Sequence, residues 1–404
     1  MTYQSETGTQ FSKEFTLQES IPQNGVERVL ELLDSGRLHR YNTLEGEASE
    51  VSLLEKDFSE YTGARYCVGM ASCGSALYVA LQSFGIKQGE LILCNAFTLA
   101  PVPGAIENAG AKPIFVEINE DYVTDLEDLE FKARESGAKY FLLSHMRGHI
   151  VDMDQVVDIC TRLNITLIED CAHTMGARWN GKFTGTFGQV GCFSTQTYKH
   201  INSGEGGLFI TNNEDVAAKA ILYSGSYMLY ESHLRKPDME VFEKYKKNIP
   251  NFSLRMSNLV AALIRAQLPV LEERCQRWNE RYRIIEQELR KDENIRVPNR
   301  RDKEEYVGSS FQFTIKSTNV EAVKRFIRTC DARGIKIKWF GNLEPKGFTS
   351  RYESWHYIHA QDSLNSTNVI LDYLCDIRIP LTFTLEDCIE VTTIIREVSQ
   401  EVFN

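Results

Sequence analysis

Short apolar runs alternate with amphipathic segments between about residues 62 and 215. Tyr66 to Met70 is one such run, and apolar residues recur at three- and four-residue steps in the segment 76–84 that follows it. Buried strands alternating with amphipathic helices are the pattern of βαβ units. The chain is therefore predicted to be an α/β protein with a mostly parallel sheet.

A length of 404 residues exceeds what one ordinary hydrophobic core holds, so two domains are expected. We predict an N-terminal arm and helix in residues 1–45, with the helix from Val26 to Leu33. A large domain follows in 46–270, and a small α+β domain in 271–404. Apolar residues in one long stripe predict a helix at the start of the small domain: Leu271, Cys275, Trp278, Tyr282, Ile285 and Leu289.

Lys199 stands five residues before the turn Gly204 to Gly207, which leads directly into the apolar run Leu208 to Ile210. A lysine on such a tight loop is fixed, and its amine can form an imine with an aldehyde, usually pyridoxal phosphate. A solvated lysine before a hairpin turn is the alternative that this segment alone leaves open.

Asp170 ends an apolar run that begins at Leu163. Ligands of open α/β sheets bind at the carboxyl ends of strands, so Asp170 is expected beside a cofactor. A carboxylate there would keep a pyridine nitrogen protonated, although Asp170 could instead cap a following helix. His173, three residues later, can stack on a cofactor ring or donate a hydrogen bond to its oxygen.

Small residues from Ala71 to Ser75 connect the strand Tyr66 to Met70 to the helix that follows. Such a turn offers backbone N–H groups and the positive end of a helix to a phosphate. The turn lacks the spacing of glycines that binds dinucleotides.

These segments together resemble the DegT/DnrJ/EryC1/StrS group of fold-type I, pyridoxal-phosphate-dependent sugar aminotransferases. The resemblance is strong over about residues 45 to 280 and looser beyond. The matching pieces occur in the order of the family: 72–77, 110–118, 144–153, 168–173, 193–207, 211–212 and 255–258. The resemblance implies a large domain with a seven-stranded, mostly parallel sheet, a small α+β domain, L-glutamate as amino donor, and a homodimer with sites at the subunit interface.

The resemblance also implies roles for single residues. Lys199 would bind pyridoxal 5′-phosphate covalently, Asp170 would pair with its ring nitrogen, and His173 would lie near its phenolic oxygen. The residues implied to bind the phosphate are Ser72, Cys73, Gly74 and Ser194.

Two implied contacts depart from the spacing of the family. Phe97 is expected to stack on the cofactor ring because it is the aromatic residue of its segment, whereas strict counting selects Leu99. The partner subunit's phosphate contact is expected from Asn251, although strict spacing selects Ser253.

The acceptor sugar is expected to be bound by a group that follows one strand. His145, Arg147 and His149 should face the cofactor, and Arg147 can clamp a carboxylate with two parallel hydrogen bonds. This favours a sugar acid, with a nucleotide-linked 3- or 4-keto hexose as the alternative. The length of the polar segment from Ser224 to Pro250 predicts a loop that closes over the site, with lysines at 244, 246 and 247.

Composition excludes several other functions. A net charge of −11 disfavours nucleic-acid binding, and no apolar stretch is long enough for a membrane span. The start of the chain lacks the basic and apolar regions of a secretion signal, and the ten cysteines form no metal-binding pairs, which is typical of a reducing cytoplasm. No metal site is expected.

Three alternative functions have less support in the sequence than transamination. A binding protein that kept only the fold would be expected to lack Lys199 or Asp170, and both are present. A dehydratase of this fold has histidine in place of the lysine, and His200 stands one position too late. A cysteine hydrolase lacks support because no nucleophile signature surrounds any cysteine.

Overall fold

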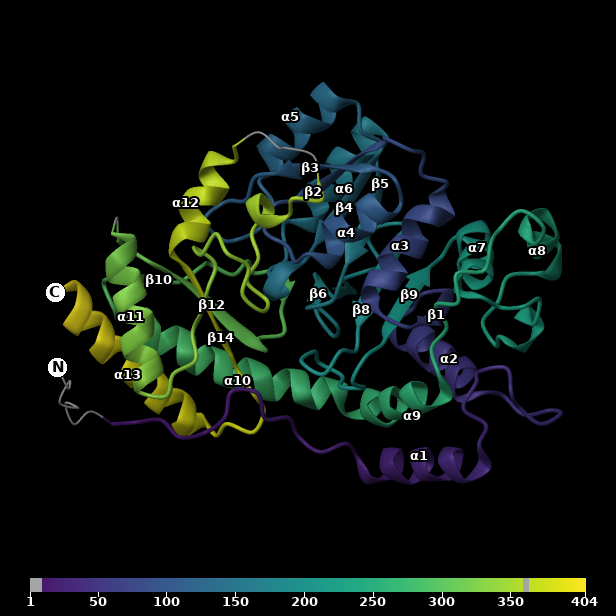
Figure 1. Cartoon of the computed structure of the whole chain (residues 1–404), viewed down its shortest axis with the longest axis horizontal. Helices are drawn as coiled ribbons and strands as arrows, with labels where there is room; N and C mark the ends of the chain where they lie inside the picture. The colour runs from purple at the N-terminus through teal and green to yellow at the C-terminus, as the bar shows by residue number, and fades with distance from the viewer. Residues whose placement is uncertain (1–8, 318, 359–362) are drawn as a thin grey trace.

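A seven-stranded sheet forms the centre of the computed structural model, which describes residues 9–317, 319–358 and 363–404 (Figure 1). The strand order is β1-β9-β8-β5-β4-β2-β3, and β9 runs antiparallel to both of its neighbours. The strands are β1 (Tyr66–Met70), β2 (Leu91–Asn95), β3 (Lys112–Val116), β4 (Tyr140–Ser144), β5 (Thr166–Asp170), β8 (Val190–Ser194) and β9 (Gly207–Thr211). The prediction of a mostly parallel sheet is confirmed.

Helices cover both faces of this sheet, and each face has its own apolar core. Phe141 and Leu143 of β4 belong to one core, whereas Leu142 belongs to the other, because successive side chains of a strand point to opposite faces. The helices around the sheet are α2 (Glu50–Thr62), α3 (Cys73–Phe84), α4 (Pro101–Asn108), α5 (Leu126–Ser136), α6 (Met153–Leu163), α7 (Glu214–Ser224) and α9 (Asn258–Gln267). With both faces covered, the carboxyl ends of the parallel strands are left to form a site.

A second, antiparallel sheet of four strands lies in the C-terminal part, in the order β10-β12-β14-β13. Its strands are β10 (Ile295–Arg296), β12 (Ser310–Ile315), β13 (Lys338–Trp339) and β14 (Leu374–Arg378), and its helices are α10 (Leu271–Leu289), α11 (Val320–Ala332), α12 (Asn365–Tyr373) and α13 (Leu385–Phe403). All six residues of the predicted stripe on α10 are buried, so that prediction is confirmed. The domain boundary at 270/271 stays a prediction. It falls at η3 (Leu268–Val270), which joins α9 to α10.

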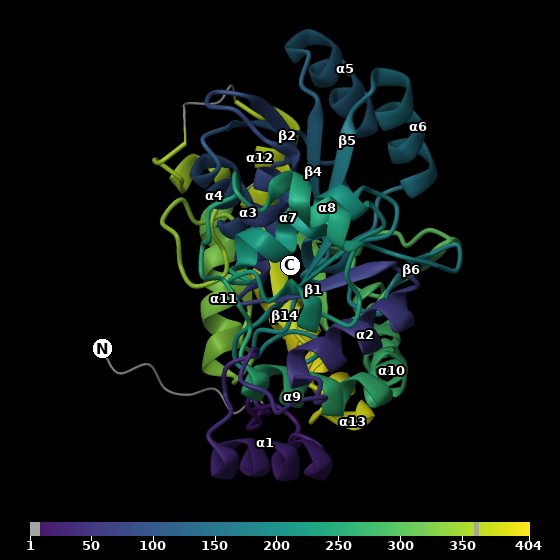
Figure 2. The ribbon, with the colours of Figure 1, turned by 90° about the vertical axis from the view of Figure 1, so that its right-hand side faces the viewer.

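The first helix, α1 (Gln23–Ser35), extends the prediction of Val26 to Leu33 at both ends. It lies against α9, at the end of the molecule opposite to α5 and α6 (Figure 2). Gly25 allows this approach, since a Cβ atom built there would lie 2.6 Å from Cβ of Ala266. Residues 1–8 of the predicted arm lie outside the described residues.

The segment between α7 and α9 is more ordered than its polar sequence predicts. It contains η2 (Tyr230–Ser232) and α8 (Met239–Tyr245), and the rings of Tyr230 and Phe242 stack with their centroids 4.2 Å apart. The shorter elements elsewhere are η1 (Met146–Gly148), β6 (Arg178–Trp179), β7 (Lys182–Phe183), β11 (Glu304–Glu305) and η4 (Tyr352–Ser354). None of the helices in the described part of the chain is long and apolar enough to cross a membrane.

Candidate active site

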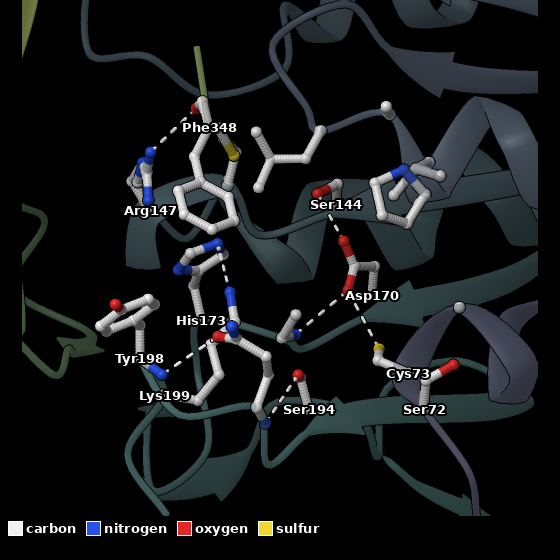
Figure 3. Close-up of a pocket in the computed structure, with 18 of the residues that line it drawn as sticks. Ser72, Cys73, Ser144, Arg147, Asp170, His173, Ser194, Tyr198, Lys199 and Phe348 are labelled. Atoms are coloured by element: carbon white, nitrogen blue, oxygen red, sulfur yellow. Dashed lines mark hydrogen bonds between the residues drawn. The ribbon is translucent and has the colours of Figure 1, made fainter. Parts of the chain in front are cut away.

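A cavity of about 480 Å³ opens at the carboxyl ends of β4, β5 and β8 (Figure 3). The N-terminus of α3 and the loop after β8 line one side of it, and β13, β14 and residues 347–350 line the other. The cavity therefore lies between the two sheets, where residues far apart in the sequence meet.

Lys199 points into this cavity, and its Nζ lies 2.9 Å from Nε2 of His173. Burial, and next the guanidinium of Arg147, lower the pKa of Lys199 to about 7. Burial and the charge of Lys199 also keep the pKa of His173 well below its usual range, so His173 is neutral and its ring can accept a hydrogen bond from the amine. Near neutral pH, the Lys199 amine is therefore partly uncharged, as a nucleophile must be.

The loop that carries Lys199 is closed at Gly206, where the backbone conformation and a close contact require glycine. Gly206 has φ of +154°, and a Cβ atom there would lie 2.3 Å from Oγ1 of Thr195. Its carbonyl accepts a hydrogen bond from the Thr195 backbone at 3.0 Å, which ties the two ends of the loop together. The turn after Lys199 thus fixes the lysine, as its sequence predicts.

Asp170 reaches the cavity from the end of β5, and both of its oxygens are held. Oδ2 accepts a hydrogen bond from Oγ of Ser144 at 2.8 Å, and Oδ1 accepts one from the backbone of Ala172 at 3.1 Å. The next element along the chain is β6, so the alternative that Asp170 caps a helix is wrong. A buried carboxylate held in this way can stabilise a cation in the cavity.

The N-terminus of α3 completes the same wall of the cavity. Oγ of Ser72 accepts a hydrogen bond from the Ser75 backbone at 3.0 Å and thereby caps the helix. Gly207 of β9 packs against this turn, since a Cβ atom there would lie 2.3 Å from the carbonyl carbon of Ser72. The positive end of the helix and its first backbone amides are suited to an anion such as phosphate.

Most of the predicted site residues line this cavity: Ser72, Cys73, Gly74, Arg147, Asp170, His173, Ser194 and Lys199. Phe97 does not. It is buried against Phe340, with ring centroids 5.1 Å apart, whereas Leu99 lines the cavity. The expectation that Phe97 faces the cofactor is therefore wrong, and strict counting along the sequence selects the residue at the cavity.

His145 and His149 are also absent from the cavity lining, and the expectation that they face a substrate is wrong. The side chain of His145 is fully buried, with Nε2 3.1 Å from the carboxylate of Glu169. Nε2 of His149 lies 2.8 Å from Oε1 of Gln312. Residues of an irregular turn point in different directions, so counting from the strand end did not place them.

The segment from 224 to 255 does not reach the cavity of its own chain. Nζ of Lys244 lies 3.6 Å from the Asp215 carboxylate, and Nζ of Lys246 lies 2.5 Å from that of Glu243, so these lysines pair with neighbouring carboxylates. Closure of the segment over its own site is not seen, and closure over the site of a partner subunit stays a prediction. The Oδ1 atom of Asn251 accepts a hydrogen bond from the Ser253 backbone at 2.9 Å. The role of either residue in a partner subunit's site stays a prediction.

No pattern in the sequence indicates the cavity residues that come from the small sheet. Lys338 of β13 and Arg378 of β14 line the cavity, and the Arg378 guanidinium lies 3.8 Å from the ring centroid of Tyr198. Lys338 and Arg378 are separated from Lys199 by more than a hundred positions in the chain. Only the packing of the small sheet against the large one brings them to the site.

Comparison with known proteins agrees with this geometry. The model of the DegT/DnrJ/EryC1/StrS aminotransferase family matches residues 20–396. GDP-perosamine synthase of Escherichia coli O157:H7 is 30% identical over 252 residues, which are 62% of this chain and 64% of that protein. The chain therefore spans less than two thirds of the length of this curated relative.

Solved structures share the fold over nearly the whole chain. An aminotransferase from Psychrobacter cryohalolentis superposes with a TM-score of 0.83 at 21% identity, covering 97% of this chain and 100% of that chain. GDP-4-keto-6-deoxy-D-mannose-3-dehydratase of E. coli, solved with bound hydrated PLP, superposes with a TM-score of 0.79 at 18% identity, covering 94% and 98%. These matches confirm the predicted aminotransferase fold. With a family match across residues 20–396, the chain belongs to the DegT/DnrJ/EryC1/StrS aminotransferase family.

Proposed function

We propose that the protein is a pyridoxal-phosphate-dependent sugar aminotransferase that moves the amino group of L-glutamate to a keto or aldehyde sugar. The observation that carries this proposal is the arrangement of Lys199, His173 and Asp170 around one cavity, with the lysine amine 2.9 Å from the histidine. A fixed amine, a carboxylate and a helix N-terminus in a cavity of about 480 Å³ fit the aldehyde, ring nitrogen and phosphate of this cofactor.

The cofactor, when bound, withdraws electrons from the substrate carbon. The carboxylate of Asp170 stabilises the protonated ring nitrogen, and the N-terminus of α3 together with Ser194 binds the phosphate. Lys199 binds the cofactor between reactions. The free Nζ atom of Lys199 would take the proton from the α-carbon of the amino donor and pass it on to the cofactor, and a pKa near neutrality favours both transfers.

The low pKa of Lys199 has a measurable consequence. Since only the neutral amine reacts, the rate at which pyridoxal phosphate attaches to the cofactor-free protein should rise with pH and level off above about 7. The rise in visible absorbance after mixing measures this rate. A rate that keeps rising toward the ordinary lysine pKa of 10.5 would show that burial does not activate Lys199.

The proposed acceptor is a sugar acid, because positively charged side chains line the side of the cavity that lies opposite Asp170. Arg147, Lys338 and Arg378 all line it. Arg147 has a left-handed backbone with φ of 55°, which is strained for a residue other than glycine, and its buried Nε has no hydrogen-bond partner among the described residues. A strained, incompletely paired guanidinium at a cavity favours an anionic ligand such as a carboxylate.

The sugar acid that we propose is 3-deoxy-manno-octulosonate oxidised to an aldehyde at C8. Its amination would give 8-amino-3,8-dideoxy-manno-octulosonate, a sugar of bacterial lipopolysaccharide, and we propose that the chain is the aminotransferase that makes it. A nucleotide-linked 3- or 4-keto hexose is the second candidate, because GDP-perosamine synthase is among the relatives and a diphosphate is also anionic. In either case, we propose a cytoplasmic enzyme.

Offering the two acceptors side by side tests the choice of substrate. The protein is incubated with L-glutamate and either the C8-oxidised octulosonate or a GDP-linked 4-keto hexose, and the aminated sugar is measured by mass spectrometry. We expect turnover of the octulosonate, and a large loss of it in Arg147→Met, whose side chain keeps an unbranched apolar stem but lacks the charge. Turnover of the nucleotide sugar alone would overturn the sugar-acid proposal and leave the chemistry of Lys199 intact.

We also propose that the active unit is a homodimer, as the family resemblance implies. Asn251 is then the candidate that reaches the phosphate site of the partner. The segment that carries Asn251 is anchored in its own chain, since Arg255 donates a hydrogen bond to the carbonyl of Gly225 at 3.1 Å. An anchored segment could present Asn251 to a partner subunit in a fixed position.

A further inference from the structure

Asp376 lies on β14 directly behind the cations of the cavity, although it does not line the cavity itself. Its side chain is fully buried. The carboxylate lies 3.0 Å from Nζ of Lys338 and 3.2 Å from the guanidinium of Arg147. Burial opposes its charge, but these two cations outweigh burial and lower the pKa of Asp376 to about 2. It is therefore a permanent anion between two cations.

The position of this carboxylate is itself fixed from behind. Nε2 of Gln312 donates a hydrogen bond to Oδ1 of Asp376 at 2.7 Å, which leaves Oδ2 for the two cations. Gln312 is in turn held by Ser310, whose Oγ accepts a hydrogen bond at 2.9 Å, and by His149 at 2.8 Å. His149 thus supports the site indirectly, from outside the cavity.

The two cations come from separate parts of the chain. Arg147 belongs to η1, after a strand of the large sheet, whereas Lys338 belongs to β13 of the small sheet. Arg147 also donates a hydrogen bond to the carbonyl of Phe348 at 3.1 Å (Figure 3). Like charges from two elements repel each other, so a shared carboxylate is needed to hold them side by side.

We propose that Asp376 is a positioning residue, which holds Arg147 and Lys338 together as one subsite for the anionic group of the substrate. Arg378, two residues after Asp376 on the same strand, lines the cavity and adds positive charge beside this subsite. The proposal rests on the proposed function in one respect. Glutamate and a sugar acid both carry a carboxylate, so the subsite serves both half-reactions in turn.

The charge balance explains why a carboxylate can strengthen the binding of anions here. Burial lowers the pKa of Lys338 to about 8, and Asp376 opposes this fall. Without Asp376, Lys338 would lose its charge more readily, and Arg147 would lose the partner that fixes its direction. An anion in the cavity would then meet fewer and less well-aimed hydrogen-bond donors.

The test uses the cofactor-loaded protein and L-glutamate without an acceptor sugar, and absorbance follows how the rate of this half-reaction saturates with glutamate. Here KM means the glutamate concentration at half the limiting rate, and kcat means that limiting rate. For Asp376→Asn, we expect the KM for glutamate to rise by about tenfold or more, and kcat to change by less than about threefold. Unoxidised 3-deoxy-manno-octulosonate, which has the carboxylate but no C8 aldehyde, should inhibit the wild type and lose about tenfold or more in affinity in the variant. Asp331→Asn is the matched control, because its exposed carboxylate pairs with Lys336 in the same part of the chain.

A second variant separates positioning from folding. Lys338→Met removes one cation of the subsite and should also raise the KM for glutamate, even if Asp376→Asn is too unstable to purify. If Asp376 acts through Lys338, the double variant should be little worse than Asp376→Asn alone, since the two effects are not independent. The positioning role would be overturned if the two increases in KM multiplied in the double variant. It would also be overturned if kcat fell at unchanged KM in both single variants.

GDP as a third probe distinguishes this inference from the choice of acceptor. Inhibition by GDP that weakens in Asp376→Asn, with no inhibition by the octulosonate, would support the anion subsite and overturn the sugar-acid proposal. Equal inhibition of the wild type and Asp376→Asn by both probes would overturn the inference, whatever the acceptor is.

Discussion

Lys199→Ala is expected to lose amino transfer almost completely, with kcat/KM reduced by about 10⁴-fold or more. Alanine removes the amine that binds the cofactor covalently and also the group that moves the proton from the substrate carbon. Asp170 and the N-terminus of α3 remain, so the variant should still bind pyridoxal phosphate weakly. The measurement is the rate of 2-oxoglutarate formation from glutamate and an acceptor sugar, at saturating cofactor.

Lys247→Ala is the control for this variant, because Lys247 is exposed and lies outside the cavity lining. It should retain full activity. Borohydride reduction of the loaded wild type, followed by peptide mapping, should label Lys199. A label on another lysine, or activity of Lys199→Ala within about tenfold of the wild type, would refute the assignment.

Asp170→Asn is expected to lower the rate of the glutamate half-reaction by about 10³-fold or more, since the change keeps the shape of the side chain and removes its charge. The ring nitrogen would then lose the anion that keeps it protonated, and electrons would be withdrawn less strongly from the substrate carbon. Cofactor affinity should fall much less than the rate, because the phosphate and lysine contacts remain.

Single-turnover absorbance with L-glutamate measures this loss directly. Asp154→Asn is a suitable control, because Asp154 is exposed and pairs with Lys303 at 2.7 Å, away from the cavity. Turnover by Asp170→Asn at nearly the wild-type rate would show that the carboxylate does not act on the cofactor.

The parts of the site that follow from the sequence are those that local structure determines. Lys199 is fixed by its own loop, Asp170 by the end of its strand, and Ser72 by the helix that it caps. Each position needs only one strand, one turn or one helix to be assigned correctly. Periodicity likewise predicted the sheet and the buried stripe of α10.

The rest of the site depends on packing between distant segments, which a pattern of residues does not reveal. Lys338 and Arg378 reach the cavity only because the small sheet packs against the large one, and Asp376 matters only because Arg147 arrives from the other side. The errors at His145 and His149 have a related cause. Both follow a strand end, but the turn at η1 directs them toward buried partners, Glu169 and Gln312.

The central claim is that Lys199 and Asp170 form the active site of a sugar aminotransferase that accepts its amino group from glutamate. Mixing the cofactor-loaded protein with L-glutamate, in the absence of any sugar, tests this claim most directly. We expect the visible absorbance of the bound cofactor to be lost and one equivalent of 2-oxoglutarate to form per Lys199 site. Unchanged absorbance and no 2-oxoglutarate, from a protein that has bound pyridoxal phosphate at Lys199, would contradict it.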